Sequence, residues 1–156
     1  KSGPLFLSDT TINVEPTSKE LAKIAQMTGH MAGLFGIEPI IALLSFSNFG
    51  SSRFSQAKKV SEAVSILHRS NPNLVVDGPI QSDFALNKEL LHKVFPFSVL
   101  NNKKVNILVF PNLDAANITY KLMKNDENRC FSTHLLNASE FRHFFNSCSK
   151  VPRLEN

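Results

Sequence analysis

The chain has 156 residues, of which 42% are hydrophobic and 19% are charged, and its formal net charge is +4. This composition is typical of one globular domain with a real core, and no apolar run approaches the roughly 20 residues of a membrane-spanning helix. The basic pairs Lys58-Lys59 and Lys103-Lys104 lie far apart in the sequence. A nucleic-acid surface needs clustered positive charge, so we expect neither nucleic acid nor a membrane as a partner.

The first half of the chain predicts two strands and two helices. A short apolar strand is expected over 5–7. Thr17 and Glu20 have the spacing of a capping box, which predicts that a helix begins there. The apolar run 40–45 predicts a buried strand, and helical periodicity predicts a second helix over 55–69.

The second half continues the alternation of strands and helices. A short strand is predicted over 74–76, ending in a turn at 77–79, and a helix is predicted over 87–94. A buried strand over 105–110 and a helix over 114–124 follow. The pattern predicts an α/β fold with three layers, in which helices cover both faces of a mostly parallel sheet.

Polar loops follow three of the predicted strands, at 45–52, 77–83 and 111–117. The carboxyl ends of parallel strands meet at one edge of a sheet, where α/β proteins usually bind their ligands. Hydroxyls and backbone N–H groups at a helix start suit a phosphate or pantetheine group. The alternative for the first loop is an ordinary Ser-rich turn. Three such loops favour a ligand site more strongly than one.

Two further pairs of side chains are candidates for the same edge. Asp77 and Asp83 have a spacing that suits an acid and a base, with turn chemistry as the alternative. Asn117 and Lys121 are four residues apart on one helical face, which suits binding of a carbonyl or a phosphate; the alternative is a solvated face. No nucleophile–base pair is evident, so we predict no catalytic residue.

The only cysteines are Cys130 and Cys148, too few for a disulfide framework. A reducing, cytoplasmic setting is therefore expected. Cys130 with His134, and His143 with Cys148, miss the usual spacing of zinc ligands. We predict no metal site.

Four segments in order resemble the phosphate acetyl/butyryltransferase family, most closely the branch fused to the C-terminus of bacterial NADP-dependent malic enzymes. The segments lie at 6–13, 43–51, 76–83 and 110–121, and include Ser-Phe-Ser-Asn-Phe-Gly-Ser at 45–51 and Asn-Leu-Asp-Ala-Ala-Asn at 112–117. Four ordered motifs are far more specific than a single match.

The resemblance implies that residues 1–124 form the second subdomain of a phosphotransacetylase-like unit, as a fragment of a larger domain. Residues 125–156 are expected to form an atypical tail, partly helical or disordered. The implied ligand is acetyl-CoA or a related acyl-CoA, with no resident cofactor in this chain. The residues expected to line the acyl-CoA and phosphate site are Thr10, Ser45, Ser47, Asn48, Gly50, Ser51, Gln81, Asp83, Asn117 and Lys121.

In the malic-enzyme branch the resemblance implies a regulatory domain that senses acetyl-CoA and forms a homo-oligomer. The parent protein would decarboxylate malate in a separate domain, with NADP and a divalent metal. The family's transferases carry Cys at the position of Thr10 and a later Ser-Arg-Gly segment that this chain lacks, so we expect the fragment to be inactive alone. The alternatives are a phosphate acetyltransferase domain, which transfers acetyl between CoA and phosphate, and a purely structural subunit-contact domain.

Overall fold

The structure is a computed structural model that describes residues 4–9, 12–124 and 131–132. Within that part the chain forms a five-stranded sheet in the order β3-β2-β4-β1-β5, and every pairing is parallel. The strands are β1 (Leu5–Ser8), β2 (Ile40–Leu44), β3 (Val75–Ile80), β4 (Ile107–Val109) and β5 (Phe131–Ser132). The predicted α/β fold with a parallel sheet is confirmed.

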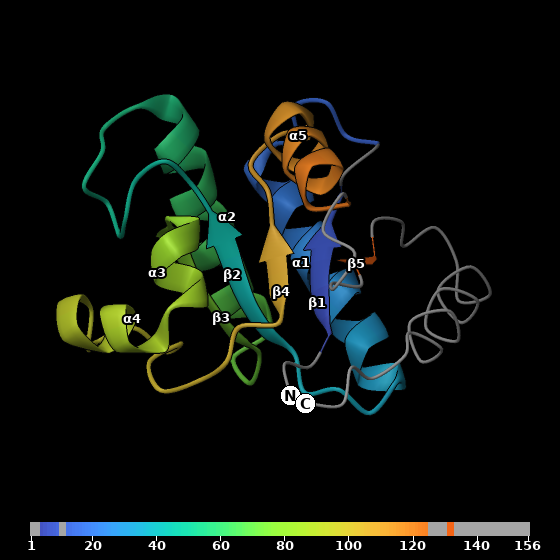
Figure 1. Cartoon of the computed structure of the whole chain (residues 1–156). Helices are drawn as coiled ribbons and strands as arrows, with labels where there is room; N and C mark the ends of the chain where they lie inside the picture. Colours follow the sequence, from blue (N-terminus) through green and yellow to red (C-terminus); the bar gives the residue numbers. More distant parts are fainter. Residues whose placement is uncertain (1–3, 10–11, 125–130, 133–156) are drawn as a thin grey trace.

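Helices cover both faces of the sheet (Figure 1). One face packs against α1 (Ser18–Leu34) and α2 (Ser55–Ser70), which also contact each other. The other face packs against α3 (Ser82–Leu86), α4 (Lys88–Val94) and α5 (Leu113–Lys124). No helix in the described part of the chain is both long and apolar enough to cross a membrane.

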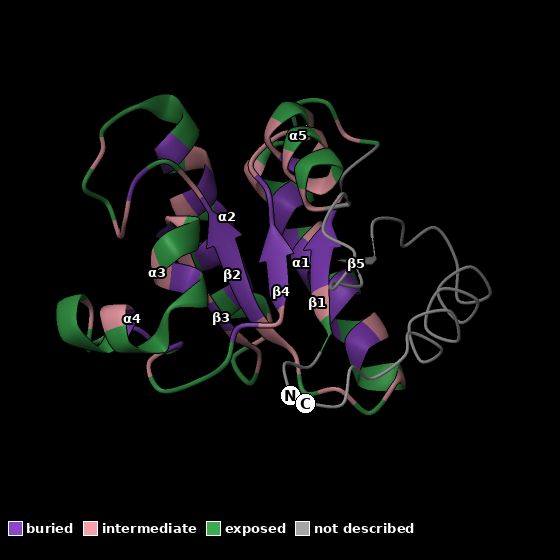
Figure 2. Ribbon diagram, in the orientation of Figure 1, coloured by how far each residue is buried: buried purple, intermediate pink, exposed green. Residues whose placement is uncertain are grey.

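Alternation along each strand divides the core into two layers. In β2, Ile41 and Leu43 face the α1/α2 layer, whereas Ala42 and Leu44 face the opposite layer. Successive side chains of a strand point to opposite faces, so a strand with helices on both sides must be apolar throughout. Figure 2 accordingly shows the central strands as almost entirely buried.

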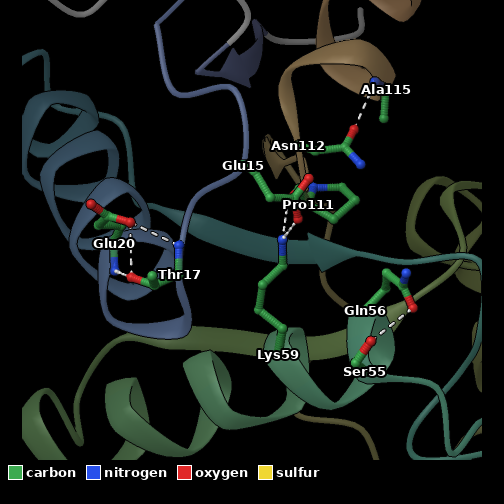
Figure 3. Close-up of polar contacts among 9 residues, drawn as sticks. All are labelled: Glu15, Thr17, Glu20, Ser55, Gln56, Lys59, Pro111, Asn112 and Ala115. Carbon is green, nitrogen blue, oxygen red and sulfur yellow. Dashed lines mark hydrogen bonds and ion pairs between the residues drawn. The ribbon is translucent and has the colours of Figure 1, made fainter.

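The capping box that the sequence predicts is present at the start of α1 (Figure 3). The Glu20 N–H donates to the Thr17 Oγ1 at 3.3 Å, and the Thr17 N–H donates to the Glu20 carboxylate at 2.8 Å. This backbone hydrogen bond, together with one from the Thr17 hydroxyl, lowers the pKa of Glu20. The helix therefore begins where local chemistry satisfies its first N–H groups.

The predicted turn at 77–79 is wrong, because these residues lie inside β3. The register shifts between Ala42 and Leu44, so β3 carries an extra residue there, as in a β-bulge. Gly78 has φ +149°, and a Cβ at this position would lie 2.5 Å from the Leu43 carbonyl oxygen. Only glycine tolerates that conformation and close approach, which allows the strand to continue.

Three other expectations differ from the structure or fall outside it. Helix α3 was not predicted, and the strand expected over 105–110 is limited to Ile107–Val109. The flanking Val105 and Phe110 are nevertheless buried. The expected tail at 125–156 lies outside the described residues, apart from the short strand β5, which pairs with β1.

Candidate functional site

The candidate site lies at the carboxyl ends of β2 and β4, which are neighbours in the sheet. After β2 the chain leads to β3, on one side of this pair of strands. After β4 it leads to β5, which lies on the other side, beyond β1. Such a topological switch point is where open parallel sheets usually bind ligands, because the diverging connections leave space above the strand ends. The loop 45–54 and the start of α5 follow these two strands.

A reciprocal amide pair joins the loop 45–54 to the end of β3. The Gln81 N–H donates to Asn48 Oδ1 at 2.8 Å, and Asn48 Nδ2 donates to Gln81 Oε1 at 2.6 Å. Gln81 Nε2 also donates to the Phe46 carbonyl at 2.9 Å. The structure thus brings together Asn48 and Gln81, two of the residues that the sequence assigns to the site.

Many backbone N–H groups of this loop are already paired inside the protein. The Ser47 and Asn48 N–H groups donate to the hydroxyls of Ser45 and Ser51, at 3.4 and 3.2 Å. The Phe49 N–H donates to the Pro79 carbonyl at 2.7 Å, and the Ser51 N–H donates to the Asn48 carbonyl at 2.9 Å. A ligand would therefore meet a preformed loop, chiefly through its side chains.

The loop hydroxyls differ in exposure. Ser47 is buried, Ser45 is half-buried, and their Oγ atoms are 3.5 Å apart. Gly50 and Ser51 lie on the exposed part of the loop, where Phe49 and Gly50 have positive φ values of 43° and 84°. Gly50 supplies a conformation that other residues rarely adopt, so its role in the turn is clear from the backbone.

The second group of predicted site residues lies on α5, after β4. Asn112 caps the start of this helix by accepting a hydrogen bond from the Ala115 N–H at 3.0 Å. Asn117 and Lys121 follow one turn apart, and Lys121 is exposed with its Nζ 5.4 Å from the Tyr120 ring centroid. The residues of α5 and those of the loop 45–54 therefore follow adjacent strands.

The two acidic residues have different environments. The Asp77 carboxylate accepts hydrogen bonds from the Gly78 N–H at 2.9 Å, the Ser98 hydroxyl at 2.7 Å and the Val99 N–H at 3.1 Å. These contacts fasten the segment after α4 to β3 and so give Asp77 a structural role. Asp83 is exposed in the first turn of α3, and Thr10 lies outside the described residues.

The charge at the site is compatible with an anionic ligand. Helix α2 has no acidic residue in its first turn, and Arg53 is exposed just before it. A helix start carries a partial positive charge that favours anions. Among the described residues, no group of three or more His, Cys, Asp or Glu side chains is arranged to hold a metal ion. Hydroxyls, amides and an ammonium suit binding and orientation of a polar ligand.

Sequence reasoning did not identify the mutual contacts that assemble this edge. The Asn48–Gln81 pair joins residues 33 apart in the sequence, and no local pattern indicates such a pairing. Lys59 was likewise not assigned to the site, although it joins three strand-end segments. Its only sequence signal is a polar residue in a helix between the inward-facing Ala57, Val60 and Ala63.

Comparisons with known proteins bear on the same region. The profile of the family described as phosphate acetyl/butaryl transferase matches residues 1–128. The NADP-dependent malic enzyme of Haemophilus influenzae is 38% identical over 99% of this chain and 20% of its own length. The phosphate acetyltransferase of Buchnera aphidicola subsp. Schizaphis graminum is 44% identical over 77% of this chain and 17% of its own length.

A solved structure is also similar. The chain superposes on a phosphotransacetylase from Streptococcus pyogenes with a TM-score of 0.71 and 42% identity, covering 77% of this chain and 36% of that one. The chain spans about a fifth of the length of the curated relatives it matches. The comparisons therefore concern one part of longer relatives.

Proposed function

Because the chain belongs to the phosphate acetyl/butaryl transferase family, we propose that the loops at the carboxyl ends of its strands bind acetyl-CoA or a related acyl-CoA. The observation that carries the proposal is the position of the family's motifs at the switch point between β2 and β4. The proposed contacts are Thr10, Ser45, Ser47, Asn48, Gly50, Ser51, Gln81, Asp83, Asn117 and Lys121.

The chemistry of the ligand supports this choice. The phosphates of an acyl-CoA are anionic, and hydroxyls, amides and ammonium groups donate hydrogen bonds to them. The hydroxyls of the loop 45–54 and the ammonium of Lys121 are such groups, and they follow adjacent strands. Because the Asn48–Gln81 pair already fixes the loop, little ordering is needed when the ligand binds.

We further propose that the chain is part of the phosphotransacetylase-like region of a malic enzyme, in which it has a regulatory and oligomer-forming role. The alignment with the malic enzyme of Haemophilus influenzae extends over 99% of this chain, whereas that with the Buchnera transferase covers 77%. The residues after the family motifs are thus aligned with the malic enzyme, which favours this branch.

Calorimetric titration of the complete gene product with acetyl-CoA tests the binding. We expect binding that saturates at ligand concentrations below about 1 mM. A dissociation constant of about 1 mM corresponds to a binding free energy of only about 4 kcal/mol. Malate oxidation with NADP is measured in the same preparation, with and without acetyl-CoA. Absence of binding at that concentration contradicts the proposal, and binding that leaves malate oxidation unchanged contradicts the regulatory role.

The second candidate is acetyl transfer between CoA and phosphate. The 44% identity to a phosphate acetyltransferase and the similarity to a solved phosphotransacetylase favour it. An assay of acetyl-phosphate formation from acetyl-CoA and phosphate separates the two candidates. Turnover of about one per second or faster is an ordinary enzyme rate and would favour the transferase.

A further inference from the structure

Lys59 of α2 joins three segments that are distant in the sequence (Figure 3). Its Nζ donates to the Glu15 carboxylate in the connection between β1 and α1. It also donates to the Pro111 carbonyl, just after β4, at 2.9 Å. The Lys59 side chain is only 15% exposed, whereas that of Glu15 is 64% exposed. The single ammonium of this mostly buried side chain is thus shared between two acceptors, one of them on an exposed residue.

The three joined segments follow neighbouring strands. Helix α2 follows β2, Pro111 follows β4 and Glu15 follows β1, and these strands are adjacent in the order β2-β4-β1. A second contact reinforces the joint, because the Leu113 N–H donates to the Val14 carbonyl at 3.1 Å. The position of Pro111 in turn sets the start of α5, which carries Asn117 and Lys121.

A charged side chain at this position costs free energy that an apolar side chain would not. Burying an ammonium costs free energy unless it is paired and hydrogen-bonded, and apolar neighbours such as Val60 pack in the same helix without that cost. An apolar side chain, however, cannot fix a carboxylate and a carbonyl in a defined geometry. The directional contacts of Lys59 indicate that it sets the arrangement of these segments.

We propose that Lys59 is a positioning residue for the acyl-CoA site: it holds the segments after β1, β2 and β4 in the arrangement that binds the ligand, without contacting the ligand itself. The proposal rests on the proposed function for the identity of the ligand. The structural part, that Lys59 fixes the start of α5 against residues 14–15, is independent of any ligand.

The adjacent residue provides a matched control. Lys58 lies in the same helix and is exposed, so Lys58→Met removes the same charge without breaking the joint. In the complete gene product we expect Lys59→Met to weaken acetyl-CoA binding about 3- to 30-fold, the range for residues that act on a site from outside it. We expect Lys58→Met to change the dissociation constant by less than about twofold, since exposed charges are screened.

The dissociation constant is measured calorimetrically at a temperature where every variant is folded. A merely structural role would lower the thermal midpoint and leave this constant unchanged. Lys59→Arg retains the charge and the donors and is expected to restore much of the affinity. Equal affinity in wild type, Lys59→Met and Lys58→Met would overturn the proposal, while the proposed function would stand.

Hydrogen exchange distinguishes the two proposals if the wild-type protein does not bind acetyl-CoA. In that case the proposed function fails. The Leu113 amide, which donates to Val14, still reports on the joint. It should exchange faster in Lys59→Met than in Lys58→Met, and equal exchange rates would show that Lys59 does not fix these segments.

Discussion

Two joints assemble the strand-end edge, and they use different chemistry. Between β2 and β3, the neutral amides of Asn48 and Gln81 exchange a pair of hydrogen bonds. Between β2, β4 and β1, the single charge of Lys59 binds Glu15 and the Pro111 carbonyl. The first joint connects one loop to the next strand, whereas the second connects three segments.

The difference predicts different responses to solution conditions. Hydrogen bonds between neutral amides are little affected by ionic strength, whereas a partly exposed ion pair weakens as salt is added. The neutral joint should therefore stay closed under conditions that loosen the charged one. Each joint can be broken by a substitution that leaves the other intact, because their polar contacts share no residue.

The largest effect is expected from a substitution that forces β2 and β3 apart. The neutral joint connects the ends of these two strands. Gly78→Ala places a Cβ 2.5 Å from the Leu43 carbonyl oxygen at φ +149°, so β2 and β3 must separate. We expect a loss of about 3 kcal/mol or more in the free energy of unfolding, measured by urea denaturation.

Gly33→Ala is the matched control for that substitution. Gly33 lies in α1, and a Cβ there would meet nothing within 4 Å. Because alanine favours the helix interior by up to about 1 kcal/mol over glycine, this variant should be equal to or more stable than wild type. Equal stability of Gly78→Ala and Gly33→Ala would show that the close approach at β3 is unimportant.

Asn48→Ala removes the neutral joint directly. It leaves the Gln81 N–H without its acceptor, and we expect a loss of about 2 kcal/mol, the cost of an unsatisfied and partly buried group. A double-mutant cycle with Gln81→Ala measures the coupling between the two side chains. Gln81→Ala keeps the backbone N–H, so the cycle isolates the side-chain hydrogen bond from Asn48 Nδ2 to Gln81 Oε1. If the two losses simply add, that side-chain bond contributes nothing of its own.

Breaking the charged joint should cost less and should depend on salt. We expect Lys59→Met to lower the free energy of unfolding by about 1 kcal/mol at low ionic strength, and by less in 1 M salt, where charges are screened within about 3 Å. The loss in Asn48→Ala should be the same at both salt concentrations. A salt-independent loss in Lys59→Met would mean that packing, and not charge, holds the three segments.

The smallest effect concerns a purely local contact next to the charged joint. Hydrogen bonds from Thr17 lower the pKa of Glu20 in the folded protein, so its carboxylate stabilises the fold above its unfolded-state pKa. That contribution is lost as the pH falls through the lowered folded-state pKa. Glu20→Gln should therefore be slightly less stable than wild type at pH 7 and equal to it in acid. An unchanged difference across this titration would contradict the capping role.

The elements with strong local signals were predicted correctly. Thr17 and Glu20 mark the start of α1, and the run 40–45 marks β2, because capping and apolar length are local properties. The segment 77–79 was misread, since Asp-Gly-Pro favours turns in isolation. Contact with Leu43 on the neighbouring strand keeps it in the sheet instead.

The sequence predicts where the candidate site lies, but not which side chains contact one another there. Parallel topology and strand-end loops indicate the edge where Ser45, Asn48 and Asn117 lie. The partners of Asn48 and Lys59 are 33 and 44 to 52 residues away, so only the folded chain brings them together. Thr10 lies outside the described residues and stays a prediction.

Hydrogen exchange of the complete gene product, with and without saturating acetyl-CoA, tests the central claim most directly. Binding at the strand-end edge predicts slower exchange in the loop 45–54 and in the first turns of α5, because a bound ligand suppresses local opening. The last turn of α1 should be unaffected, since α1 leads to the start of β2, at the opposite edge of the parallel sheet. Binding that protects other segments, and leaves exchange in the loop 45–54 and in the first turns of α5 unchanged, would contradict the account.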